Sequence, residues 1–138
     1  MHLTQESDYA IRIIYCLAKN QKRMDARTIS QEMSVSLRFS LKILGKLVGS
    51  GLVASFKGNR GGYELALPAK QITMLDVIRA VEGPYQLSRC LDECGECNRG
   101  ASGICAFQQV FRRVSEQVNR ELAAVDFEQI VADSVSHK

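Results

Sequence analysis

The chain has 138 residues, of which 46% are hydrophobic and 24% are charged, and its net charge is +3. This length suits one domain, and the composition is that of an ordinary globular protein without repeats or low-complexity segments. The N-terminus has no signal-peptide pattern, and no apolar stretch approaches the roughly 18–20 residues of a membrane span. We therefore expect a cytoplasmic protein with no membrane partner.

The charge is divided unevenly along the chain. Residues 1–70 carry eleven Lys and Arg against five Asp and Glu, whereas residues 71–138 carry seven against ten. A basic N-terminal half favours a polyanionic partner. Chance clustering would give the same difference, so charge alone leaves both interpretations open.

Three helices are predicted in the first fifty residues. Apolar residues from Tyr9 to Leu17 recur at helical spacing, which predicts a helix over about residues 6–19 with Cys16 as a small buried side chain. Asp25 is a good N-cap for a short second helix, and Ser34 or Ser36 can cap a third that ends near Gly51. The apolar side chains that the third helix is expected to turn inward are Leu37, Leu41, Leu44, Leu47 and Val48.

Two short β-prone segments follow, Leu52 to Phe56 and Tyr63 to Leu67, separated by a segment with three glycines and one asparagine. These residues suit the positive φ angles of a hairpin tip. Thr73, with Asp76 at the capping-box position, starts a fourth helix that ends near Gly83. A polar loop over residues 85–104 then leads to a long helix, with apolar positions from Phe107 to Val125, and to a last short helix.

The order helix, helix, helix, hairpin predicts a mainly α fold, a winged helix-turn-helix with a two-stranded wing and a long C-terminal helix. Arg38 and Ser40 are expected to contact base edges, and Lys42 and Lys46 are expected to contact phosphates. The wing tip would meet a minor groove. A solvated lysine face and a plain hairpin are the alternatives, but the two basic elements together favour DNA. The candidate residues of the wing tip are Lys57, Asn59 and Arg60.

Four of the five cysteines fall within sixteen residues, with three, two and seven residues between successive members. In a reduced compartment such a cluster favours metal binding, although a reversible disulfide and inert thiols remain alternatives. A structural zinc site usually has two closely spaced pairs, and here only one pair is close. Spacing alone therefore leaves an iron–sulfur cluster and zinc both open. The four cysteines are Cys90, Cys94, Cys97 and Cys105.

Several segments together resemble the Rrf2 family of winged-helix regulators over nearly the whole chain. They are Leu3-Thr4 with Asp8-Tyr9-Ala10, Ser36 followed by Lys42-Ile43-Leu44, Gly51-Leu52-Val53, and the wing from Lys57 to Tyr63. The resemblance implies a homodimer, linked through the long helix, that binds a double-stranded DNA operator. It also implies an iron–sulfur cluster, [4Fe–4S] or [2Fe–2S], held by three cysteines and a variable fourth ligand.

Within this resemblance, Cys90, Cys97 and Cys105 match the three ligand positions best, with longer intervals than the family usually has, and Cys94 is extra. The IscR branch has a histidine where this chain has Gln108, and a glutamate where it has Leu41. The NsrR branch takes its fourth ligand from an aspartate at the position of Asp8 in the partner's first helix. The chain is thus more similar to the NsrR and RirA branches than to IscR.

The predicted organisation is a DNA-binding module over residues 1–83 and a cysteine loop with dimerisation helices over residues 84–138, in one continuous fold. The resemblance implies a transcriptional regulator, expected to be a repressor, that senses nitric oxide, redox state or iron. No catalytic constellation indicates an enzyme. A cluster-free regulator dependent on thiols or zinc, and a small metal or electron-transfer protein, are the alternatives.

Overall fold

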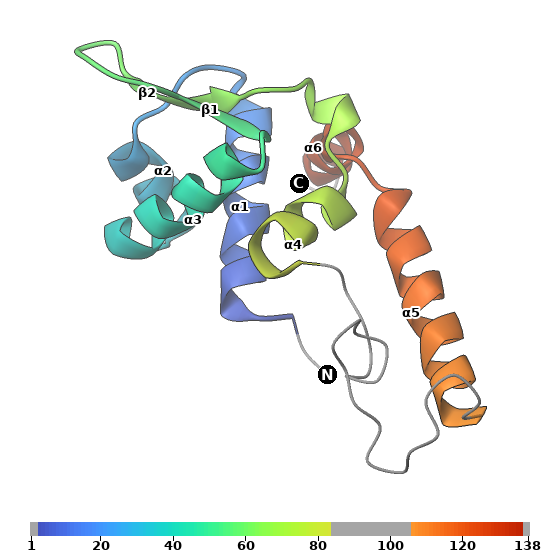
Figure 1. Ribbon diagram of the computed structural model, residues 1–138. Coiled ribbons are helices and arrows are strands. Elements are labelled where there is room, and N and C mark those ends of the chain that lie inside the picture. Colours follow the sequence, from blue (N-terminus) through green and yellow to red (C-terminus); the bar gives the residue numbers. More distant parts are fainter. Residues whose placement is uncertain (1–2, 84–105, 137–138) are drawn as a thin grey trace.

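The computed structural model describes residues 3–83 and 106–136 (Figure 1). The predicted loop over residues 85–104 and the four clustered cysteines lie outside the described residues. The element order confirms the predicted mainly helical fold with a two-stranded wing and a long helix near the C-terminus. The elements are α1 (Gln5–Asn20), α2 (Ala26–Met33), α3 (Leu37–Gly49), β1 (Val53–Phe56), β2 (Gly62–Leu65), η1 (Ala69–Gln71), α4 (Met74–Glu82), α5 (Ala106–Ala123) and α6 (Phe127–Ser136).

Capping side chains set the helix starts. Asp25 caps α2 as predicted, accepting a hydrogen bond from a main-chain N–H at 3.2 Å. Of the two serines considered for α3, Ser36 is the N-cap, and Ser34 instead ends α2 with a left-handed φ of 56°. Thr73 and Asp76 form the predicted capping box at α4. Asp25, Ser34 and Ser36 thus fix the ends of the short connections between the first three helices.

The core surrounds α1, which contacts α2, α3, α4, α6 and β2. Its Ile13, Ile14 and Cys16 are fully buried, the last as predicted. From the other end of the chain Phe127, the first residue of α6, is also fully buried in this core. Burying one such large apolar side chain contributes about 1.5–3 kcal/mol. The N-terminal helices and α6 are therefore packed around one shared core.

The wing is joined to the α1–α2 loop, residues 21–25, near the tip end of β2. Strands β1 and β2 pair antiparallel, with Phe56 opposite Gly62. Met24 then pairs with Tyr63 through two main-chain hydrogen bonds of 2.9 and 2.7 Å. A Cβ on Gly62 would lie 2.6 Å from the Met24 carbonyl oxygen, so this close approach requires glycine. The loop thus extends the wing by one short bridge.

Helix α5 packs mainly against α4 and runs away from α3 and the wing, which lie together on the opposite side of the molecule (Figure 1). Only Gln108 and Ser115 of α5 are buried. Among the described segments, no helix is both long and apolar enough to cross a membrane.

Candidate nucleic-acid interface

The buried stripe of α3 contains Leu44 and Leu47 as predicted but differs at its other positions. Its members are Ser40, Ile43, Leu44 and Leu47, spaced three and four residues apart. Leu37 and Leu41 are 37% and 47% exposed, so the expectation that they face inward is wrong. Both stripes fit a helical period, and packing against α1 and α4 selects the one containing Ile43.

Ser40 was expected to reach base edges, and this expectation is also wrong because the side chain is fully buried. Its hydroxyl oxygen has no hydrogen-bond partner within the described part of the chain. The small volume of serine explains how a polar side chain occupies a position in a helix-packing stripe. Ser40 is therefore a packing residue rather than a DNA contact.

The exposed face of α3 carries Arg38 and Lys42, which lie one helical turn apart and opposite the buried stripe. The helix contains no acidic residue that could neutralise them. Arg38 is the second residue of the helix, just after the Ser36 cap. This is the part of a recognition helix that reaches base edges in the major groove. Both residues thus have the exposure that the sequence predicted for them.

Lys46 is engaged within the protein. Its Nζ lies 2.5 Å from the carboxylate of Glu6 on α1 and 3.5 Å from the carbonyl oxygen of Val81 on α4. A phosphate contact by Lys46 would have to compete with this ion pair. The lateral position of Lys46 on α3 allows these bonds, and the leucine pattern gave no indication of them.

The wing tip presents Lys57, Asn59 and Arg60, all exposed as predicted. Sequence reasoning missed Arg23 in the α1–α2 loop, whose guanidinium carbon lies 3.4 Å from the centre of the Phe56 ring. The same guanidinium donates to the carbonyl oxygen of Arg60 at 3.1 Å. No local pattern distinguishes Arg23 from any solvated cation, because its partners are more than thirty residues away.

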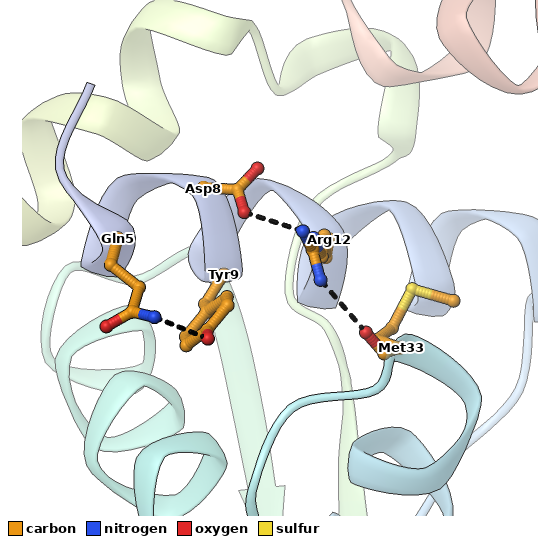
Figure 2. A network of polar contacts seen from close by, with 5 residues as sticks. All are labelled: Gln5, Asp8, Tyr9, Arg12 and Met33. Atoms are coloured by element: carbon orange, nitrogen blue, oxygen red, sulfur yellow. Dashed lines mark hydrogen bonds and ion pairs between the residues drawn. The ribbon is translucent and has the colours of Figure 1, made fainter. Parts of the chain in front are cut away.

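A second group of polar contacts lies at the N-terminal half of α1 (Figure 2). Asp8 and Arg12 form an ion pair at 2.9 Å, and Arg12 also donates to the carbonyl oxygen of Met33 at 3.4 Å. Met33 is the last residue of α2, where helical carbonyl groups lack partners within the helix. Asp8 remains about half exposed, so its carboxylate is accessible from outside the chain.

Cys16 lies on α1, apart from the four clustered cysteines, and is buried. Burial, followed by a hydrogen bond to the Glu32 carboxylate at 3.2 Å, raises its pKa to about 12. Metal ligation and nucleophilic chemistry require the thiolate, so Cys16 stays an inert thiol near neutral pH. No group of three or more potential metal ligands occurs in residues 3–83 and 106–136.

Comparison with known proteins gives a consistent assignment. The family profile described as "Rrf2: Iron-dependent Transcriptional regulator" matches residues 3–133. Protein aau3 of Rhizobium meliloti is 33% identical over 114 residues, which cover 82% of this chain and 73% of that protein. The HTH-type transcriptional regulator IscR of Xenorhabdus nematophila is 29% identical over 133 residues, covering 95% of this chain and 79% of that protein.

Solved structures agree with this assignment. CymR of B. subtilis, described as the global cysteine regulator, has a TM-score of 0.77 at 25% identity, covering 96% of this chain and 97% of its own. IscR of T. potens also has a TM-score of 0.77, at 19% identity over 97% of this chain and 88% of its own, which shows the shared fold. The named regulators among these proteins control transcription and are not enzymes. The chain belongs to the Rrf2 family of DNA-binding transcriptional regulators.

Proposed function

We propose that this regulator is a homodimer that binds a two-fold-symmetric operator as a repressor, with a DNA affinity that responds to an iron–sulfur cluster. The observation that carries the DNA-binding part is the pair of basic elements on one side of the molecule. Arg38 and Lys42 are exposed on α3, and Lys57 and Arg60 are exposed on the wing. A helix in the major groove with a basic wing in the neighbouring minor groove uses both elements at once.

The homodimer is proposed from the exposed apolar residues of α5. Phe107 and Val110 are 61% and 43% exposed, although both belong to the apolar stripe of the helix. Further along the same face, a mostly apolar groove of about 280 Å³ is lined by Val114, Val118 and Leu122, together with Gln117 and Glu121. An exposed apolar stripe of this length marks a protein contact. A second copy of α5 supplies a matching stripe across a two-fold axis.

The cluster ligands are proposed from the donor set that the chain offers. Thiolates are the ordinary ligands of iron–sulfur clusters, and Cys90, Cys97 and Cys105 are the proposed three. The fourth is Asp8 of the partner subunit or Cys94. The exposed ion pair that Asp8 makes with Arg12 costs little to break, which leaves its carboxylate available. The bound cluster would supply the group that reacts with nitric oxide or oxygen, or that is lost when iron is scarce.

These residues suggest how the two activities are coupled. Cys105 directly precedes α5 in the sequence, so ligation there would hold the start of the proposed dimer helix. If the cluster-bound protein favours one placement of the two α3 helices of the dimer, cluster binding changes operator affinity by linkage. Asp8, Gln108 and Leu41 favour a regulator similar to the NsrR and RirA branches.

Substitutions on α3 test the DNA contact. Arg38→Ala should cost about 1–3 kcal/mol of operator binding and relax the preference at one base pair, because it removes a base-edge contact. Lys42→Ala should weaken operator and random duplex alike and lower the salt slope by about one, because it removes a phosphate contact. The measurement is fluorescence anisotropy over a salt series, on an operator selected from random DNA.

The matched control is Arg79→Ala, which removes one exposed cation from α4, a helix that belongs to neither of the two basic elements proposed to contact DNA. It should leave both affinities unchanged. An equal loss on operator and random DNA in Arg38→Ala would contradict the base-contact role. A wild-type protein that selects no sequence would contradict the proposed function itself.

A further inference from the structure

The wing is a glycine-rich hairpin whose tip extends past its last strand pair. The tip, residues 57–61, connects Phe56 to Gly62, and Gly58 has a left-handed φ of 94°. Glycine-rich tips lose much conformational entropy when they are fixed. A wing that meets DNA in one orientation therefore needs contacts that order its tip before binding.

Arg23 supplies three such contacts from outside the hairpin. Its guanidinium lies over the Phe56 ring, 3.4 Å from the ring centre, at the end of β1. Nη1 donates to the carbonyl oxygen of Arg60 at 3.1 Å, and Nη2 lies 3.6 Å from the carboxylate of Glu64 on β2. One side chain thus connects both strands and the tip. Its own main chain is fixed because the next residue, Met24, pairs with Tyr63.

We propose that Arg23 is the positioning residue of the wing, holding the main chain at Arg60 so that the side chains of Lys57 and Arg60 meet DNA in a fixed orientation. This inference rests on the proposed contact between the wing and DNA. The stacked face and the hydrogen-bonding fork act together, as only the planar guanidinium allows. The exposed ion pair with Glu64 contributes least.

The contacts of Arg23 argue against a direct role at a phosphate. Two of its terminal nitrogens face Arg60 and Glu64, and one face of the guanidinium covers Phe56. A phosphate contact through the bonded N–H of Nη1 would have to break the hydrogen bond to Arg60. The effect of Arg23 on DNA should therefore pass through the side chains that it positions, and this distinguishes it from Lys42.

The test is a double-substitution cycle on the operator. Arg23→Ala should lower operator affinity about fivefold, which is the size expected from losing a cation–π contact with its hydrogen bond. In an Arg60→Ala background the same substitution should cost less than about twofold, because coupled residues are not additive. Lys22→Ala removes the same charge from the same loop and is the matched control. Arg23→Lys should recover only part of the affinity.

A second measurement needs no DNA. Hydrogen exchange of residues 57–62 should accelerate in Arg23→Ala, while exchange in α4 stays unchanged. Additive losses with a salt slope lowered by about one would make Arg23 a phosphate contact and overturn the proposal. Full recovery by Arg23→Lys, unchanged exchange at the wing, or an Arg60→Ala protein with wild-type affinity would also overturn it. A wild-type protein without sequence preference refutes the proposed function, whereas the exchange result still tests Arg23.

Discussion

Val118→Asp is expected to convert the dimer into a monomer and to lower operator affinity at least about 100-fold, because a monomer loses the avidity of two linked half-sites. Val118 lines the mostly apolar groove on α5 between Val114 and Leu122. A carboxylate placed there would lose its hydration on dimerisation without gaining a partner. Sedimentation equilibrium measures the association state, and fluorescence anisotropy measures the DNA affinity.

Gln109→Asp is the matched control for this substitution. Gln109 is exposed on α5 and lies two and a half helical turns before Val118, which places it on the opposite face of the helix. The substitution therefore adds the same charge to the opposite face. It should remain dimeric and bind DNA as the wild type does. A Val118→Asp protein that stays dimeric would show that the dimer forms through another surface.

Replacing Cys90, Cys97 or Cys105 by alanine is expected to abolish cluster binding. Anaerobically purified wild type should be coloured and contain iron with acid-labile sulfide. Each variant should lose both, because it removes one of the three thiolates proposed to hold the cluster. Cys16→Ala is the control, since burial and the Glu32 hydrogen bond keep this residue a neutral thiol, and it should retain the iron. Iron and sulfide analysis with absorption spectra provides the measurement.

The same assay distinguishes the possible fourth ligands. Asp8→Ala should weaken cluster retention and Cys94→Ala should behave as the wild type, although a thiolate is intrinsically the softer ligand for iron. The reverse result would identify Cys94 as the fourth ligand. Stoichiometric zinc without visible absorption would instead establish a zinc-dependent regulator, and colourless metal-free protein would favour a thiol-based one.

Much of the fold follows from local signals in the sequence. Asp25 and the Thr73–Asp76 pair cap helices because their side chains bond main-chain groups only three residues away. The glycines of the wing were recognisable for the same reason, since the turn itself requires them. The exposed side chains of the site, Arg38 and Lys42, could also be placed, because α3 forms as predicted.

The incorrect predictions concern side chains whose burial or contacts are determined by tertiary packing. Leu41 and Ser40 are adjacent in sequence, and hydrophobicity alone assigns the leucine to the core, whereas the close packing of α3 buries the serine. The partners of Lys46 and Arg23 are distant in sequence, so no pattern within one segment indicates them. Sequence periodicity cannot identify these partners, although they decide which of several exposed cations are free to contact DNA.

Operator affinity in the cluster-loaded and cluster-free forms of one preparation tests the central claim most directly. Both forms are titrated anaerobically against the selected operator and a random duplex of equal length, at matched salt concentrations. The cluster-loaded form should prefer the operator at least about 1,000-fold. Removal of the cluster should lower that affinity about 5- to 150-fold, the usual range of allosteric coupling. Equal operator affinities in the two forms would contradict cluster control of DNA binding.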